Sequence, residues 1–349
     1  MDRALILTAI RQLEVEELPH RDIAPEEVRI RTLFSGISAG TELSQYRGTS
    51  PYMNGFWDAE RRVFRGGEPS WSFPVRNLGY EEVGEIVEIG AGVSQLKPGD
   101  RVFGTWGHRT GHVMSEADIG GRVLPAGADP RIGIFSHIGA VALNGVHDAR
   151  IRLGDLVVVF GLGVPGQIVV QAAHASGATV IGVDPVPFRR QMAERMGAAR
   201  TCDPTAGSVA DAIKDSNGGR GADICIEVSG SPPALAEAMR TVTYAGRVVA
   251  MGFFQGETRG LRLGDEFHHN RIELISSQIS GVAPEASHRW SKPRLWEAAV
   301  RLQCEGRLNL LPLITEMVPF AEAPALFARL DQGGDPSILQ SVLNFGALT

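Results

Sequence analysis

The feature that most constrains the fold is a stretch without charged side chains, which runs from just after Asp155 to just before Asp184. Its length would suit a membrane-spanning helix. A glycine-rich turn that contains Pro165 interrupts the stretch, however, and the residues around it divide into a strand, a helix and a second strand. We therefore predict a buried strand-helix-strand unit at the centre of the chain, and no membrane span.

The turn inside this stretch has the spacing of a dinucleotide-binding fingerprint. It follows a predicted strand, precedes a predicted helix, and reads Gly161-Leu162-Gly163-Val164-Pro165-Gly166. In such a turn, Gly161 permits the tight bend, Gly163 lets backbone N–H groups approach a pyrophosphate, and Gly166 lets the helix pack closely on the strand. The N-terminus of the helix adds partial positive charge. We predict that these six residues bind a dinucleotide.

The residue that ends the second strand favours one cofactor. Asp184 follows Gly161 at the spacing where a carboxylate accepts hydrogen bonds from the adenosine ribose. It would also repel a 2′-phosphate, because two negative charges about 4 Å apart at an effective dielectric of about 20 repel by roughly 4 kcal/mol. Arg189 and Arg190 either offset part of this repulsion or lie on the solvated face of the next helix. We predict NAD as the cofactor, with Asp184 and Arg189 among the residues that bind it.

Composition narrows the class of function. The chain has 349 residues, which favours two domains, and its net charge of −6 argues against a general nucleic-acid binder. Its three cysteines cannot form a disulfide framework, and its first apolar run is too short and too soon acidic for a signal peptide. We therefore expect a cytoplasmic protein that acts on a small molecule and binds neither nucleic acid nor membrane.

The pattern of the chain changes near residue 125. Short strands and turns predominate before it, whereas apolar strands alternate with helices from residue 155 to residue 280. This alternation predicts a doubly wound parallel sheet. The tail after residue 285 adds helices and strands that either continue this sheet or return to the first domain. The expected class is α/β, with a β-rich domain and a Rossmann domain.

Several segments, in their order along the chain, resemble the medium-chain dehydrogenase/reductase superfamily of zinc alcohol dehydrogenases and quinone reductases. They are Ser35 to Glu42, Gly79 to Gly84, Lys97 to Val102, the glycine turn, Gly219 to Asp223 and Gly246 to Val249. The resemblance implies a GroES-like catalytic domain over 1–146 that 285–349 rejoins, and a Rossmann domain over 147–284. It also implies a dimer through edge strands near 272–280, so we expect a homodimer or homotetramer. The first two segments, Ser35 to Glu42 and Gly79 to Gly84, look most like the branch of bacteriochlorophyllide-type hydroxyethyl dehydrogenases.

The chain departs from this family at the positions that bind zinc. Zinc-dependent members place a cysteine where Ser38 and Ala39 stand and a histidine where Tyr80 stands, and they carry a cysteine lobe that this sequence lacks. Zinc favours thiolate and imidazole ligands. We therefore predict that the protein binds no zinc.

His137 falls where many relatives carry a third, acidic metal ligand. One interpretation is a metal site with oxygen and nitrogen ligands, to which the sequence offers Glu42, Glu81, His108 and His112. The other is that His137 is a hydrogen-bonded residue of the pocket or core. Both stay open at this point.

Without a metal, the reaction still needs a side chain that takes or gives the hydroxyl proton of the substrate. The resemblance would aim the residues at the vacated ligand positions toward the substrate oxygen. Tyr80 is the first candidate and His137 the second, with Ser38 and Thr41 as hydrogen-bond relays. We expect Glu81 to orient its neighbours.

Aromatic residues are dense between positions 44 and 80. Because aromatic faces suit ring-shaped substrates, we predict a substrate pocket that contains Tyr46, Tyr52, Trp57 and Trp71. The alternative is a loop whose aromatic residues form a small core of their own.

These observations favour an NAD(H)-dependent oxidoreductase that interconverts a secondary alcohol and a ketone without zinc, on a sugar-like or polycyclic substrate. A metal-free reductase of polarised C=C bonds, of the quinone or enoyl reductase type, is the first alternative. A cofactor-binding protein without turnover is the second, and the loss of the zinc ligands motivates it.

Overall fold

The computed structural model describes residues 1–346. The chain forms two compact units, of which the first contains Met1–His137 and the residues from Leu311 onward, and the second contains Ile138–Leu310. The chain passes from the first unit to the second inside helix α4 (Phe135–Ala149). We had expected the return at residue 285. The second unit extends further, because helix α9 (Lys292–Cys304) packs within it, with Ala299 against Gly139.

The second unit is built on a six-stranded parallel sheet of order β11-β10-β9-β12-β13-β14. Its strands are β9 (Leu156–Phe160), β10 (Thr179–Val183), β11 (Arg200–Cys202), β12 (Ala222–Glu227), β13 (Val242–Ala250) and β14 (Glu273–Ser276). The central strand β9 pairs with β10 on one side and with β12 on the other, so that Val158 lies between Ile181 and Cys225. This is the strand order of a Rossmann fold and confirms the predicted class. The winding reverses between β9 and β12, and such sheets bind ligands at the carboxyl ends of the strands at that point.

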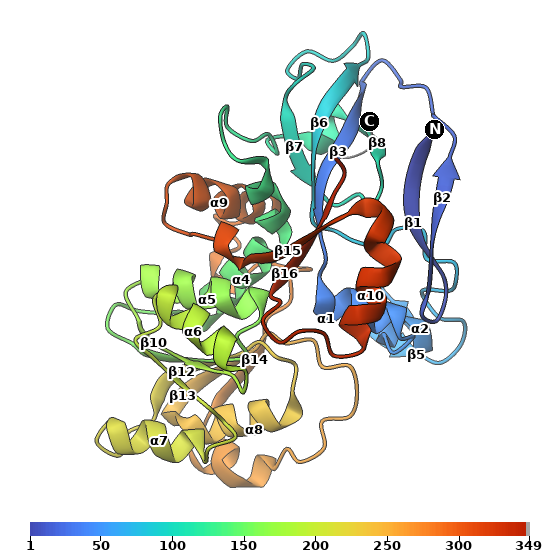
Figure 1. Cartoon of the computed structure of the whole chain (residues 1–349). Helices are drawn as coiled ribbons and strands as arrows, with labels where there is room; N and C mark the ends of the chain where they lie inside the picture. The colour runs from blue at the N-terminus through green and yellow to red at the C-terminus, as the bar shows by residue number, and fades with distance from the viewer. Residues whose placement is uncertain (347–349) are drawn as a thin grey trace. The chain divides into compact units, whose positions relative to one another are not determined.

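Helices cover both faces of this sheet. They are α5 (Val164–Ala175), α6 (Pro187–Arg195), α7 (Val209–Ser216) and α8 (Pro232–Thr241). Figure 1 shows α5 and α6 on one face and α7 and α8 on the other. Because both faces are covered, Val157, Val158 and Val159 of β9 are all fully buried and the strand is a continuous apolar run. The uncharged stretch thus forms β9, α5 and β10, as predicted, and no helix among residues 1–346 is long and apolar enough to cross a membrane.

The first unit contains a sheet of order β15-β16-β3-β6-β7, with β8 also paired to β3. Its strands are β3 (Glu27–Gly36), β6 (Glu82–Ile89), β7 (Arg101–Gly104), β8 (Gly111–Ser115), β15 (Ile314–Pro319) and β16 (Gln340–Asn344). Strand β16 runs antiparallel to β3, with Val342 opposite Gly36. The tail of the chain therefore returns to the first unit and does not extend the Rossmann sheet.

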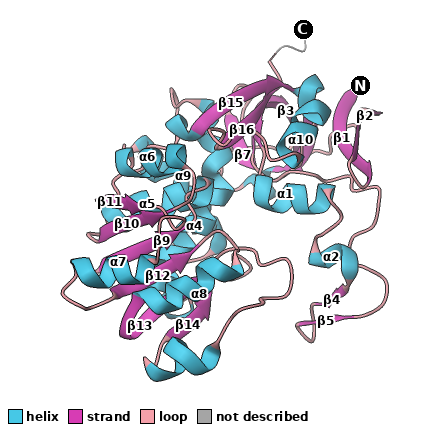
Figure 2. Ribbon diagram, turned by 60° about the horizontal axis from the view of Figure 1, so that its bottom comes forward, coloured by secondary structure: helices cyan, strands magenta, loops and turns pink. Residues whose placement is uncertain are grey.

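A hairpin of β1 (Asp2–Ala9) and β2 (Gln12–Leu18) and the helices α1 (Ala39–Tyr46) and α10 (Ala323–Asp331) complete most of this unit. Apolar side chains of β1, α1 and α10 share one core, which includes Leu5, Leu43 and Phe327. The shorter elements are α2 (Pro51–Asn54), α3 (Glu116–Ile119) and a hairpin of β4 (Phe56–Asp58) and β5 (Val63–Arg65), which Figure 2 shows next to α2. Because α1 packs in this core, the core fixes the position of the residues at the N-terminus of α1.

Candidate active site

The glycine turn of the second unit has the conformation that its sequence predicts. Gly161 has a φ of +91°, a region that L side chains rarely adopt. A Cβ on Gly166 would lie 1.9 Å from the carbonyl oxygen of Gly161, so α5 packs against the turn at a distance that only glycine allows. A Cβ on Gly163, in contrast, would meet nothing within 4 Å. Open space in front of this residue at the N-terminus of α5 fits a bound pyrophosphate.

Asp184 ties the end of β10 to this turn. Its Oδ2 accepts a hydrogen bond from the backbone N–H of Leu162 at 2.8 Å, and its Oδ1 accepts one from Val186 at 2.8 Å. The carboxylate is buried, yet each oxygen keeps a second lone pair with which to accept a ribose hydroxyl. Arg189 places Nη1 3.9 Å from Oδ2, whereas Arg190 pairs with Asp203 at 3.1 Å. These placements fit the predicted role of Asp184 and put Arg189 closer to its carboxylate than Arg190.

A second carboxylate at the carboxyl ends of the strands was missed by the sequence analysis. Glu227 ends β12 and is fully buried, and its side chain accepts hydrogen bonds from the backbone N–H groups of Ser229 at 2.8 Å and Gly230 at 3.1 Å. Burial raises the pKa of Glu227. The residue holds the loop between β12 and α8 beside the point where the winding reverses. An acidic residue directly after the apolar run Ile224 to Ile226 was the available signal.

In the first unit, four of the five predicted catalytic residues form one group, which we call the tyrosine cluster: Tyr80, Ser38, Thr41 and His137. The phenol O–H of Tyr80 donates a hydrogen bond to Oγ of Ser38, and the hydroxyl of Thr41 also hydrogen-bonds the phenol. The ring of His137 lies edge-on to that of Tyr80, with 4.9 Å between the centroids. Burial, followed by the charge of Glu81, raises the pKa of Tyr80, so the phenol holds its proton in the free protein.

A second layer of side chains holds the tyrosine cluster in place. Oε1 of Glu42 accepts a hydrogen bond from the backbone N–H of Ser38 at 2.8 Å, and Oε2 lies 2.8 Å from Nε2 of His108. Nδ1 of His108 lies 2.6 Å from Oγ of Ser35, which donates to Glu82 at 3.0 Å. We call Glu42, His108, Ser35 and Glu82 the glutamate network, and all four are at most 1% exposed.

The carboxylates of this network act on the pKa of His108. Both ring nitrogens lie within hydrogen-bond distance of an oxygen, Nε2 of the Glu42 carboxylate and Nδ1 of the Ser35 hydroxyl. Burial by itself lowers the pKa of His108, but the Glu42 and Glu82 carboxylates outweigh burial and raise it. The sequence offers Glu42 and His108 as candidate metal ligands and gives no sign of a role for Ser35 and Glu82 in the site.

Glu81, the fifth predicted catalytic residue, directly precedes β6 and lies close to Gly36 of β3 and Gln340 of β16. It is 1% exposed, and its Oε2 accepts a hydrogen bond from Nε2 of Gln340 at 3.3 Å. A Cβ on Gly36 would lie 2.4 Å from the same oxygen. Burial and the charges of Glu42 and Glu82 hold the pKa of Glu81 well above its usual value. Its close packing fits an orienting role.

The donors of the first unit do not fit zinc. The hydroxyls of Ser38 and Tyr80 bond each other, and Glu42 and His108 are already paired. His112 stacks on Trp106 with 5.9 Å between centroids, and burial, with nearby arginines, lowers its pKa to about 4. Within residues 1–346, no group of three or more His, Cys, Asp and Glu side chains is arranged to hold a metal ion. That the protein binds no zinc stays a prediction.

The predicted aromatic pocket needs a correction at one position. Tyr46 is 4% exposed and packs in the core of the first unit, with its ring centroid 5.8 Å from that of Phe327. It lies on the inner face of α1 and is not available to a substrate. Tyr52 and Trp71 stack at 4.7 Å, and Phe64 packs against both Tyr52 and Trp57. Trp71 and Phe64 are 36% and 46% exposed, so these rings form a partly exposed stack. A substrate role for Tyr52, Trp57 and Trp71 and the alternative of a loop with its own small core both stay predictions.

Comparison with known proteins supports the assignment of both units. Residues 24–149 match the alcohol dehydrogenase GroES-like domain family, and residues 165–296 match the zinc-binding dehydrogenase family. The chain is 34% identical to D-guloside 3-dehydrogenase of Escherichia coli (strain K12), over 97% of this chain and 99% of that protein. It is 28% identical to (R,R)-butanediol dehydrogenase of Bacillus subtilis (strain 168), over 88% of this chain and 90% of the relative.

Solved structures show the same fold at lower identity. The structure of 2R,3R-butanediol dehydrogenase from Bacillus subtilis aligns with a TM-score of 0.79 and 23% identity, over 99% of both chains. A protein of Sinorhizobium meliloti 1021 that was solved bound to NADP aligns with a TM-score of 0.80 and 22% identity, also over 99% of both chains. At these identities, the likeness establishes the fold.

Proposed function

The chain belongs to the medium-chain dehydrogenase/reductase superfamily and is an oxidoreductase of the alcohol dehydrogenase type, and from this premise we propose a more specific function. The protein interconverts a secondary alcohol and a ketone on a ring-containing, sugar-like substrate, with NAD(H) as cofactor and without zinc. The observation that carries this proposal is the tyrosine cluster, because it supplies a proton-transfer group where zinc-dependent relatives hold their metal.

The second unit supports the choice of NAD. The glycine turn leaves open space at Gly163 for a pyrophosphate, and Asp184 offers lone pairs to the ribose hydroxyls while its charge repels a 2′-phosphate. The nicotinamide ring, when bound, accepts or gives the hydride. Arg189, which lies 3.9 Å from the carboxylate, weakens the repulsion without abolishing it. NAD is therefore the favoured cofactor.

The first unit supplies the proton. Tyr80 keeps its proton in the free protein, so a proton is present for the oxygen of a ketone as the hydride arrives. In the direction of alcohol oxidation, Tyr80 must accept the hydroxyl proton, which requires a positive charge nearby, and the oxidised nicotinamide ring carries one. Ser38 and Thr41 orient the phenol, and the glutamate network holds the backbone of Ser38 through Glu42.

The proposed substrate class rests on a relative. D-guloside 3-dehydrogenase, 34% identical over nearly the whole chain, is named for the oxidation of a sugar derivative. The aromatic segment around Tyr52 and Trp71 is a surface on which a sugar ring can stack. We also propose that the protein is cytoplasmic and forms a homodimer or homotetramer through the edge strand β14.

Steady-state kinetics with NAD(H) and NADP(H) test the proposal. The substrate panel contains glycosides and their keto forms, acyclic diols and cyclic enones, and the absorbance of the reduced nicotinamide reports turnover. We expect Tyr80→Phe to lower kcat by roughly a hundredfold while the affinity for NAD stays within a few-fold. Tyr46→Phe is the matched control, since it removes the same hydroxyl from a core position.

Two results would contradict the proposal. Near-full turnover in Tyr80→Phe would assign the proton transfer to another group, with His137→Ala as the next variant to measure. Reduction of the cyclic enones, together with inactivity toward every alcohol and ketone, would instead favour a reductase of C=C bonds. Such a reaction depends least on proton transfer by Tyr80.

A further inference from the structure

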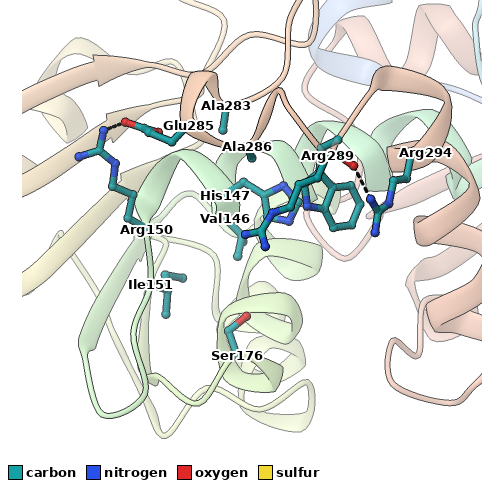
Figure 3. Close-up of a pocket in the computed structure, with 11 residues that line it drawn as sticks. Val146, His147, Arg150, Ile151, Ser176, Ala283, Glu285, Ala286, Arg289 and Arg294 are labelled. Carbon is teal, nitrogen blue, oxygen red and sulfur yellow. Dashed lines mark hydrogen bonds and ion pairs between the residues drawn. The ribbon is translucent and has the colours of Figure 1, made fainter.

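A cleft of about 730 Å³ lies in the second unit, away from the glycine turn. The C-terminal end of α4, the segment from Ala283 to Trp290 and the N-terminal end of α9 line it (Figure 3). Ser176, just after the last turn of α5, also lines it, whereas the glycine turn lies at the other end of α5. A helix of this length spans about 18 Å. The cleft is therefore separate from the dinucleotide site.

Three arginines face this cleft: Arg150, Arg289 and Arg294. Arg150 forms an ion pair with Glu285, the sole carboxylate among the residues that line the cleft. Within the described part of the chain, no carboxylate oxygen lies within 4 Å of the guanidinium of Arg289 or Arg294. Because the whole chain has a net charge of −6, this concentration of unpaired positive charge is a local exception.

An aromatic residue of the cleft, Trp290, holds one of these charges in position. The guanidinium of Arg294 lies 4.3 Å from the ring centroid of Trp290, and its N–H donates to the backbone carbonyl of Arg289. The ring of His147 packs on Trp290, with 4.5 Å between centroids. Nδ1 of His147 is buried and lacks a hydrogen-bond partner within residues 1–346. Burial and the charges of Arg289 and Arg294 lower the pKa of His147, so a nearby anion would raise it again.

We infer that this cleft binds a small phosphorylated compound, with Arg289 and Arg294 as the residues that hold its phosphate groups. The planar guanidinium group forms paired hydrogen bonds with phosphate oxygens. Packing on Trp290 fixes Arg294 before the ligand arrives, so less side-chain entropy is lost on binding. A cleft of this volume accommodates an organic group in addition to the phosphate.

Calorimetric titration with inorganic pyrophosphate tests this inference. The full-length protein is kept saturated with its nicotinamide cofactor, so that the glycine turn is filled, and chloride holds the ionic strength constant. We expect saturable binding, which Arg289→Gln and Arg294→Gln each weaken by roughly tenfold or more. Both side chains are exposed, so the variants should fold. Arg152→Gln is the matched control, because Arg152 is also exposed but lies outside the cleft.

A second readout locates the anion. Nuclear magnetic resonance of the histidine ring protons should show that pyrophosphate raises the pKa of His147. The ring-proton signals of His20, which lies in the other unit, should not respond to pyrophosphate. Absence of saturable binding, equal weakening by Arg152→Gln, or an unchanged pKa of His147 would each overturn the inference. The test does not depend on the substrate or on zinc, so its failure is distinct from failure of the proposed function.

Discussion

Replacement of Asp184 by asparagine separates two roles of this residue. Its carboxylate accepts the backbone N–H groups of Leu162 and Val186, each at 2.8 Å, and it supplies the negative charge that we expect to disfavour NADP. Asparagine keeps the size of the side chain and removes the charge. Its carbonyl oxygen accepts one of the two N–H groups, but its amide nitrogen cannot accept the other. Alanine would lose both hydrogen bonds and obscure the effect of charge.

The magnitude follows from the charges around the turn. A 2′-phosphate about 4 Å from the carboxylate is repelled by roughly 4 kcal/mol at an effective dielectric of about 20. Arg189, which is 3.9 Å from the carboxylate and has a side chain 34% exposed, attracts the same phosphate. If this attraction offsets about half of the repulsion, about 2 kcal/mol remain, which is roughly a 30-fold preference for NAD. Asp184→Asn should reduce this preference to a few-fold and lower stability by about 1–3 kcal/mol for the unpaired N–H group.

Fluorescence titration with NADH and NADPH measures both affinities, and urea unfolding measures the stability. Arg189→Gln is the matched variant of opposite sign, because it removes an attraction for the phosphate and should widen the preference for NAD. The reasoning is refuted if the unmodified protein binds NADH and NADPH equally, or if Asp184→Asn weakens both without a change in their ratio.

Three further predictions concern zinc, pH and the glycine turn. Elemental analysis of the purified protein should find far less than one zinc per chain, and about one zinc retained after mild chelation would contradict the assignment of the tyrosine cluster. Burial raises the pKa of Glu82, so its carboxyl group keeps a proton up to a higher pH in the folded protein than in the unfolded chain. The free energy of unfolding therefore falls as the pH rises above the pKa of Glu82 in the unfolded chain. Glu82→Gln should flatten this fall, measured by urea unfolding between about pH 5 and pH 8. Gly166→Ala should abolish cofactor binding and destabilise the second unit by about 1–3 kcal/mol, because the added Cβ would meet the carbonyl oxygen of Gly161. Gly163→Ala should have the same free energy of unfolding as the unmodified protein, because its added Cβ would meet no atom within 4 Å.

Local sequence signals were sufficient for the second unit. The turn from Gly161 to Gly166 and the apolar strands around it are contiguous in the chain. The turn requires glycine and the buried strands require apolar side chains, and both requirements can be recognised within a few neighbouring residues. No element was predicted over the residues of helix α4, from Phe135 to Ala149, most of which are buried in the structure. The local pattern also did not reveal that α9 packs against α4, which moved the boundary of the unit to Leu310.

The candidate site was predictable only in part. Resemblance to the family placed Tyr80, Ser38 and His137 in one group, and the structure brings them together. The glutamate network joins residues far apart in sequence, such as Glu42 and His108, and no local pattern reports such a pairing. Tyr46 was assigned to the pocket wrongly, because aromatic density does not distinguish a ring on the inner face of α1 from a ring that meets a substrate.

The glutamate network fixes the geometry of the tyrosine cluster through hydrogen bonds between buried side chains. Ser38 is oriented by one carboxylate oxygen of Glu42, and the other oxygen of Glu42 lies 2.8 Å from Nε2 of His108. Removing one partner of a buried ion pair costs about 3–5 kcal/mol, since the other charge is left uncompensated. Because the link from Ser38 to Glu42 runs through the backbone N–H, the network holds the cluster in place and does not conduct protons from it. Changes at His108 or Glu42 should therefore lower turnover and stability together, whereas loss of the Tyr80 hydroxyl should lower turnover alone.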